Sequence, residues 1–358
     1  MKRILTALIV AFALVSSAIA GKNDGRLDIY WIDVEGGAAT LIVTPAGESV
    51  LIDTGNPGVR DPARIFDTAV KTAGLREINH LIVTHYHRDH FGGASQLAKL
   101  IPIRTVYDNA EFEGQREFPT QDYKDLKADK RVQINPGDEL KLVQPDGGAA
   151  KLVFRCLATR QQVYKSKNPA DGKAPSPGGR GGEAANECCK DSQRKPIDRS
   201  DNANSVVMLL EFGGFRFFDG GDLTWNIEEK LVCPVNLVGK VDVYQSTHHG
   251  LDQSNNNVLV KSLEPIVAVF NNGTTKGCEP MSFATLKETP SVKAIYQVHK
   301  NLRPDGEKNN APDEYIANHE KECKGNHIKL SVAPDGKSYT VSVPANKHEM
   351  TYQVRGSN

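Results

Sequence analysis

The sequence lacks several features that define large classes of proteins. Beyond residues 1–20 no apolar run is long enough to cross a bilayer, so we expect no membrane span in the rest of the chain. Lys and Arg number 44 against 44 Asp and Glu, so no global basic field attracts nucleic acid. No internal repeat is visible, which argues against a solenoid. Histidine is scarce, with ten among 358 residues.

The six cysteines lack the C-x-x-C spacing of a zinc knot. In an exported chain an even number of cysteines favours disulfides, although buried thiols are the alternative. Cys188 and Cys189 are adjacent, and we expect them to bond to two different partners rather than to each other.

Residues 1–20 have the layout of a cleavable secretory signal. Lys2 and Arg3 precede an apolar stretch, and Ala18-Ile19-Ala20 supplies small residues for cleavage. The stretch is shorter than a membrane span, and no cysteine follows it to accept a lipid. We therefore expect a periplasmic or secreted protein in which residues 21–358 form one domain.

Strand-like runs recur along this domain. They cover residues 26–34, 39–45, 49–55 and 79–85, and later 206–212, 215–219, 241–246 and 265–270. Helical patterns follow at 61–74, 92–101, 223–232 and 281–289. Because strands followed by helices occur in both halves, the pattern predicts an α/β fold with two similar halves.

One segment interrupts this pattern. Eight of the nineteen residues from 168 to 186 are Gly or Pro, which predicts a loop or lid inserted around residues 160–200. Residues 160–199 hold nine Lys or Arg against five Asp or Glu, an excess that suits phosphate, although charged loop residues are usually only solvated.

The stretch "THYHRDH" places four metal-binding side chains in six positions at the end of a predicted strand. A lone histidine is more often structural than a ligand, but such a dense cluster favours a metal site. His85 and His87 can point to one ion, and Asp89 and His90 to a second. Imidazole and carboxylate groups suit zinc at neutral pH.

Two later strand ends offer further donors. Asp222 follows two glycines that allow close backbone approach, and its carboxylate is a candidate bridge between two ions. Asp219 is its competitor, and a helix N-cap is the alternative role for Asp222. Of the adjacent His248 and His249, His248 is favoured because it lies nearer the strand, with His249 as the alternative.

The ordered set "IDTG", "THYHRDHFGG", "NANSVVMLL", "DGGDL" and "STHHG" resembles the metallo-β-lactamase superfamily, and within it the hydrolase domain of ComEC-type DNA-uptake proteins. The resemblance implies an αββα sandwich of two mixed sheets flanked by helices, with a two-metal centre at one edge. It also implies a role for each donor. The first ion would take His85 and His87; the second would take Asp89, His90 and His248; Asp222 would bridge, and Asp53 would orient a ligand histidine.

Two departures from that resemblance matter. No histidine occurs between Phe91 and Thr247, so the first ion is expected to be open or completed by water, substrate, Asn202 or Asn204. This argues against a β-lactamase site. Cys278 stands in "GCEP" where ComEC-like chains often have histidine, and we expect it to be a disulfide partner.

These features predict an exported hydrolase with two divalent ions, zinc or manganese, that activate a water oriented by Asp89 or Asp222. The favoured substrate is a phosphoester, either a small molecule or a nucleic acid. The alternatives are a lactone, another ester or an amide, and a non-catalytic binding protein. No obligate protein partner is evident.

Overall fold

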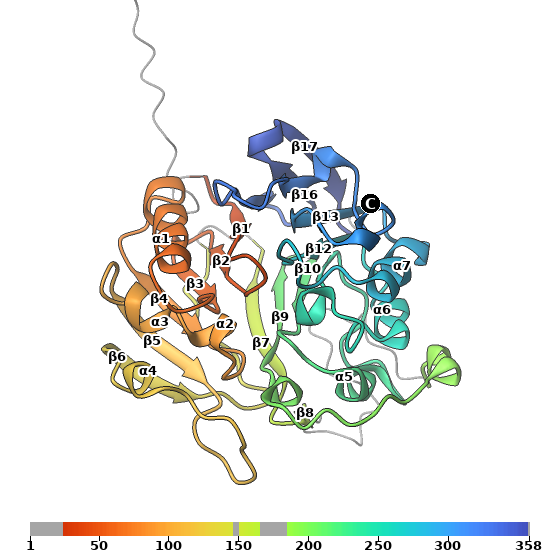
Figure 1. Cartoon of the computed structure of the whole chain (residues 1–358), viewed down its shortest axis with the longest axis horizontal. Helices are drawn as coiled ribbons and strands as arrows, with labels where there is room; N and C mark the ends of the chain where they lie inside the picture. Colours follow the sequence, from red (N-terminus) through yellow and green to blue (C-terminus); the bar gives the residue numbers. More distant parts are fainter. Residues whose placement is uncertain (1–23, 146–149, 165–184, 357–358) are drawn as a thin grey trace, which may run out of the picture.

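Two β-sheets face each other, with helices on both outer faces (Figure 1). This computed structural model describes residues 24–145, 150–164 and 185–356. The predicted αββα sandwich is confirmed. The predicted signal, residues 1–20, lies outside the described residues, and so does the central part of the predicted lid, residues 165–184.

The first sheet has nine strands within the described residues, in the order β17-β16-β15-β1-β2-β3-β4-β5-β6. Its strands are β1 (Leu27–Trp31), β2 (Thr40–Val43), β3 (Ser49–Ile52), β4 (Ile78–Ile82), β5 (Ile103–Asp108), β6 (Ala128–Gln133), β15 (Ile328–Val332), β16 (Ser338–Val343) and β17 (His348–Gln353). Strands β3 to β6 are parallel, and the others pair antiparallel.

The second sheet has eight strands in the described part of the chain, in the order β14-β13-β12-β11-β10-β9-β7-β8. Its strands are β7 (Leu152–Thr159), β8 (Gln162–Val163), β9 (Val207–Phe212), β10 (Phe215–Asp219), β11 (Val243–Gln245), β12 (Val267–Phe270), β13 (Ala294–His299) and β14 (Ile316–Asn318). Strands β10 to β14 are parallel.

The helices divide between the two outer faces, with α1 to α4 on the first sheet and α5 to α7 on the second (Figure 1). The α-helices are α1 (Arg60–Asp67), α2 (Arg88–Phe91), α3 (Ala94–Leu97), α4 (Gln121–Lys124), α5 (Trp225–Val232), α6 (Asn257–Leu263) and α7 (Pro280–Glu288). The π-helix η1 (Thr68–Thr72) continues α1. The 3₁₀ turns are η3 (Glu187–Asp191), η4 (Asp201–Asn204), η5 (Thr247–Gly250), η6 (Pro304–Glu307), η7 (Asp313–Tyr315) and η8 (Pro344–Asn346).

The helix expected over residues 92–101 is much shorter than its pattern suggested. Only α3 forms there, and it begins after Gly93, which packs against the chain after β3: a Cβ at Gly93 would lie 2.2 Å from the carbonyl oxygen of Thr54. The two glycines therefore serve a close backbone approach behind the metal-binding cluster rather than a continuous helix.

The central core lies between the sheets and consists of the alternate apolar side chains that each strand turns inward. Trp31 of β1 and Phe217 of β10 meet edge to face, with ring centroids 5.7 Å apart. Two further apolar clusters bury the outer face of each sheet under its helices. The core thus fixes both sheets relative to each other and leaves their strand ends to carry polar groups.

The cysteine predictions are only partly confirmed. Cys189 forms a disulfide with Cys233. The other four cysteines are thiols, so Cys188 lacks the separate partner expected for it. The expectation that Cys278 is a disulfide partner is wrong, because its buried thiol instead donates to the carbonyl oxygen of Asn309 at 3.0 Å. Among the described residues, no helix combines the length and apolarity needed to span a bilayer.

Candidate metal centre

The predicted ligands lie at the carboxyl ends of strands from both sheets. His85 follows β4 and α2 carries Asp89 and His90, whereas Asp222 follows β10 and the two adjacent histidines follow β11 in η5. Parallel strands present their carboxyl ends at one edge, so separate segments converge there. Gly221, with φ of +53°, allows this approach, since a Cβ would lie 3.0 Å from the Cβ of Thr84.

Asp222 is the centre of the cluster and is almost completely buried. Its Oδ2 lies 3.1 Å from His90 Nε2, 3.3 Å from His249 Nε2, 3.5 Å from His248 Nε2 and 3.9 Å from His85 Nε2. One carboxylate oxygen therefore faces four imidazole nitrogens, which is the arrangement needed for a bridging ligand.

The outer nitrogens of His90 and His249 are fixed by acceptors that cannot donate. His90 Nδ1 lies 2.7 Å from Asp53 Oδ2, and His249 Nδ1 lies 3.3 Å from the carbonyl oxygen of Asn271. Each Nδ1 must therefore carry a proton, so Nε2 is the nitrogen that each ring offers to the cluster. These two Nε2 atoms are only 3.2 Å apart.

The Nδ1 atoms of His248 and His85 are held in the same way, by hydroxyl oxygens that accept. Ser254 Oγ donates to the carbonyl oxygen of Leu223, so it accepts from His248 Nδ1 at 3.3 Å. Thr84 Oγ1 donates to Asp53 Oδ2, so it accepts from His85 Nδ1 at 3.1 Å. All four buried imidazoles thus hold Nδ1 against an outer partner and turn Nε2 inward.

The donor set fits divalent ions. His85 Nε2 is buried and has no hydrogen-bond partner, a costly state that coordination would relieve. Outer acceptors on Nδ1, Asp53 above all, are typical of metal-binding histidines. Two groups of three have ligand atoms within 4.8 Å of one another: His85, His90 and Asp222, and Asp89, His90 and His249.

The geometry gives the two adjacent histidines different neighbours. His249, not His248, lies with Asp89 and His90, and its Nε2 is 3.5 Å from Asp89 Oδ2. Both histidines have left-handed φ angles, of 52° and 56°, so the chain reverses within η5 and carries the second ring deeper. Such strained backbone persists where its surroundings fix it, often at functional sites.

His87 lies apart from this buried cluster. Its ring centroid is 4.6 Å from that of His85, but its Nε2 lies 2.6 Å from Glu117 Oε2 and its side chain is 27% exposed. The structure therefore does not bring His87 to Asp222. Glu117 was not predicted, because it lies in the loop before α4 with no pattern around it.

Of the other predicted residues, one contacts the cluster and two do not. Asn202 Nδ2 lies 3.3 Å from His248 Nε2, so Asn202 is part of the cluster. Asn204 turns away and donates to Asp201. Asp219 is also outside: its Oδ1 accepts from the Gly221 amide, and burial raises its pKa to about 7. Asp222, rather than its competitor Asp219, therefore lies among the imidazoles.

Lys276 is a site residue that the sequence analysis missed. Its ammonium group pairs with Asp89 Oδ2. Burial alone would raise the pKa of Asp89, but His90, His249 and Lys276 hold that pKa well below its usual value. Lys276 follows β12, so the strand-end rule that indicated the histidines would also have indicated this lysine.

Burial controls the protonation of the remaining groups. It lowers the pKa of His85 well below its ordinary value, and neighbouring His90 adds to the effect. Burial also lowers the pKa of His248 to about 4. Burial alone would raise the pKa of the Asp222 carboxyl, but His249 and His90 hold that pKa well below the usual range. Burial alone would lower the pKa of His90, but Asp222, Asp53 and Asp89 raise that pKa well above its ordinary value, so metal binding at this ring would release a proton.

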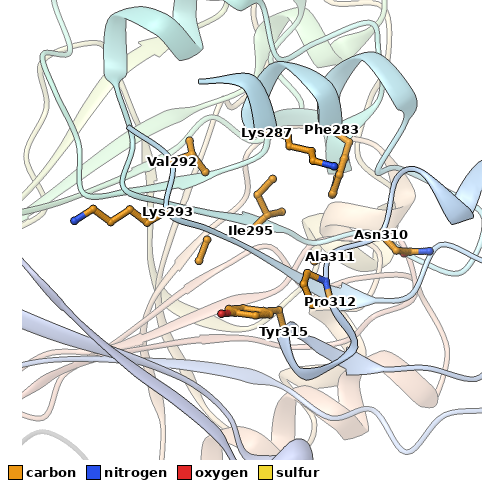
Figure 2. Close-up of a pocket in the computed structure, with 10 residues that line it drawn as sticks. Phe283, Lys287, Val292, Lys293, Ile295, Asn310, Ala311, Pro312 and Tyr315 are labelled. Atoms are coloured by element: carbon orange, nitrogen blue, oxygen red, sulfur yellow. The ribbon is translucent and has the colours of Figure 1, made fainter. Parts of the chain in front are cut away.

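A separate pocket of about 470 Å³ lies between α7, β13 and η7. Figure 2 shows Ile295 and Tyr315 lining it, with Phe283 on the side of α7. It is built from mostly apolar side chains with two lysines and Asn310, and none of the predicted ligands lines it. The pocket therefore does not belong to the metal centre.

Comparison with known proteins agrees with this geometry. The family model described as the metallo-beta-lactamase superfamily matches residues 32–156. An atrochrysone carboxyl ACP thioesterase of Cryptosporiopsis sp. is 29% identical over 42% of this chain and 42% of its own length. The competence protein ComA of Neisseria gonorrhoeae is 25% identical over 74% of this chain and 30% of its own. A metal-dependent hydrolase of Cupriavidus taiwanensis is 34% identical over 42% of this chain and 47% of its own length.

The chain spans less than half the length of each of these relatives. The matched residues 32–156 nevertheless include Asp53 and the whole "THYHRDH" stretch, and the structure adds Asp222 and η5 from the second sheet. Residues 32–156 therefore match the superfamily that the sequence resembles.

Proposed function

We propose that this protein is a hydrolase that uses two divalent metal ions to cleave phosphoesters, with phosphodiesters as the favoured class. The observation that carries the proposal is the inward orientation of four imidazole Nε2 atoms on Asp222. A buried set of imidazole nitrogens around one ionised carboxylate is suited to binding cations rather than to acid–base chemistry by the side chains alone.

Bound divalent ions would supply Lewis acidity and an activated water. The chain's own groups would position the reaction. Asp222 and Asp89 are ionised and acceptor-only, so they can orient a water and take up its hydrogen bonds. His85, His90 and His249 hold the centre, while Asp53 keeps His90 in the required tautomer.

An anionic substrate is supported by the positive groups around the centre. Lys276 lies against Asp89 and is 38% exposed, so it can turn to a phosphoryl oxygen. Arg116 and Arg199 line a pocket of about 230 Å³ that also includes Asp201 and Asn204 of η4. The same turn carries Asn202 to His248, so the pocket adjoins the cluster.

The absence of a histidine between Phe91 and Thr247 also supports phosphoesters as the substrate class. With His87 drawn to Glu117, the side of the centre near His85 has few neutral ligands. A phosphoryl oxygen carries negative charge and fills an open coordination position better than a neutral lactam carbonyl does. The metal-dependent hydrolase of Cupriavidus taiwanensis and the competence protein ComA are relatives consistent with this reading.

Export is also part of the proposal, supported by the signal-like composition of residues 1–20. The disulfide between Cys189 and Cys233 is in keeping with an oxidising compartment. We further propose that the predicted lid around residues 160–200 contributes basic groups to the substrate.

The second candidate is hydrolysis of a carboxylic ester or thioester, which the similarity to a fungal ACP thioesterase favours. A lactone would be opened by the same chemistry. The two classes differ in charge at the reacting group, so Lys276 should matter for phosphodiesters and little for neutral esters.

The test is a substrate panel with the full chain after metal removal and reloading with Zn²⁺ or Mn²⁺. We expect the highest kcat/KM with a phosphodiester, loss of turnover in Asp222→Ala, and a raised KM for phosphodiesters alone in Lys276→Ala. Lys300→Ala, which removes a lysine paired with Asp313 elsewhere on the surface, is the matched control. A higher kcat/KM for a lactone, thioester or β-lactam than for every phosphodiester would contradict the substrate class. Full activity of Asp222→Ala would contradict the metal mechanism.

A further inference from the structure

A second group of metal-binding side chains lies outside the centre described above. Asp33, His299 and Cys323 have ligand atoms within 4.8 Å of one another. Asp33 and His299 are completely buried, and Cys323 is half-buried. Carboxylate oxygen, imidazole nitrogen and thiolate sulfur are together a donor set that suits zinc.

Three distant segments supply this group. Asp33 follows β1 of the first sheet, His299 ends β13 of the second sheet, and Cys323 lies in the loop between β14 and β15. The group therefore joins the two sheets at strand ends, as the His/Asp centre does. None of these residues belongs to that centre or to its outer partners.

His299 is oriented as a ligand. Its Nδ1 lies 3.0 Å from the carbonyl oxygen of Lys300, which can only accept, so Nδ1 carries the proton. Its Nε2 is then an unprotonated acceptor, and it is buried without any hydrogen-bond partner. An orphaned acceptor facing a thiol and a carboxylate is expensive to keep in the folded state unless something binds it.

Cys323 and Asp33 are already in contact. The Sγ of Cys323 donates to Asp33 Oδ2 at 2.9 Å. Burial raises the pKa of Cys323 to about 11, and the hydrogen bond to Asp33 adds to the effect. Without a cation, Cys323 therefore stays a thiol, which argues against a role as a nucleophile.

Two neighbouring side chains offer a fourth donor oxygen and a positive charge beside the carboxylates. Glu35 Oε1 lies 4.0 Å from Cys323 Sγ. Arg64 contacts Asp33 Oδ2 at 3.2 Å and Glu35 Oε1 at 3.2 Å, so it holds both carboxylates in place. Gly325 leaves room for this guanidinium, since a Cβ there would lie 2.5 Å from Arg64 Nε.

We propose that Asp33, His299 and Cys323 bind a zinc ion, with Glu35 as the nearest fourth donor, and that this ion fastens the two sheets together. On binding, the S–H bond of Cys323 breaks, a sulfur–zinc bond forms and the proton passes to solvent. The site is structural and is independent of the hydrolase proposal, which uses other residues.

Cobalt substitution tests the site directly, because the His/Asp centre contains no cysteine among its described residues. A thiolate-to-cobalt charge-transfer band in the near ultraviolet therefore reports on Cys323 alone. We expect the band in the wild-type chain loaded with Co²⁺, its loss in Cys323→Ser, and one fewer bound zinc per chain in that variant. His299→Gln should weaken cobalt binding by roughly tenfold or more.

Cys188→Ser is the matched control, since Cys188 is also a half-buried thiol but lies far along the sequence in η3. It should keep the band and the zinc content. Zinc should also protect Cys323 from alkylation in the wild-type chain and not in His299→Gln, which remains informative if Cys323→Ser folds poorly.

Absence of the band in the wild-type chain, or its persistence in Cys323→Ser, would overturn the proposal. Equal alkylation of Cys323 with and without zinc would do the same. Neither result would affect the hydrolase proposal, whose test measures turnover by the His/Asp centre.

Discussion

Replacing Asp53 by Asn is expected to weaken metal binding at the His/Asp centre while the chain remains folded. Asp53 accepts from the Thr84 amide at 2.8 Å through Oδ1, and from Thr84 Oγ1 and His90 Nδ1 at 2.7 Å through Oδ2. An amide at residue 53 can keep the Oδ1 contact with its carbonyl oxygen. Its NH₂ group would then face His90 Nδ1 and donate to it.

This reversal changes the tautomer of His90. With Nδ1 accepting, the proton moves to Nε2, and that nitrogen no longer has a lone pair for the ion. Loss of such an outer partner typically costs roughly 10- to 100-fold in metal affinity. That range corresponds to about 1.4–2.7 kcal/mol of binding free energy.

The assay is competition with a chelator at fixed pH, monitored as metal retained per chain. Both titrations use the Cys323→Ser background, so that only the His/Asp centre is counted. Asp219→Asn is the matched control, because Asp219 is an equally buried neighbouring carboxyl whose Oδ1 accepts from the Gly221 amide. Wild-type affinity in a folded Asp53→Asn chain would refute the tautomer argument.

Two further predictions concern stability. Replacing Cys189 and Cys233 by Ser opens a loop of sequence separation 44. The chain-entropy model predicts a loss of about 4 kcal/mol in unfolding free energy, which urea denaturation measures. A loss below about 1 kcal/mol would show that this loop is already ordered in the unfolded state. Phe217→Ala removes the ring that meets Trp31 between the sheets, and a cavity there should cost about 3–5 kcal/mol. A thermal midpoint equal to that of the wild type would mean that the sheets repack.

Much of the architecture could be predicted because alternation and turn residues mark strands locally. The runs at 26–34, 39–45 and 49–55 correspond to β1, β2 and β3, and the run at 206–212 corresponds to β9. The helix expected over 92–101 failed for a tertiary reason. Its two glycines approach Pro57 and Thr54, which lie far away in sequence, so both serve close packing at the start of the expected helix.

The ligands were predictable where the chain places several donors together. "THYHRDH" is such a stretch, and two of its four donors, His85 and His90, converge on Asp222. The choice between His248 and His249 was not predictable, because it depends on two consecutive left-handed residues in η5. The position of His87 depends on Glu117, and no local pattern connects these two residues.

The second group of candidate ligands was even harder to predict from the sequence. Asp33, His299 and Cys323 each look like a single polar residue in the sequence, and a single residue of that kind is usually structural. They meet only because β1, β13 and β14 all run toward the same edge of the sandwich, where the parallel strands also place the His/Asp centre. A sequence scan detects donors clustered along the chain, whereas a fold that gathers strand ends can build a site from isolated ones. The unpartnered Nε2 of His299 is the sign that distinguishes such a site from a chance meeting of polar groups, because burial without a partner carries a cost that a bound ion removes.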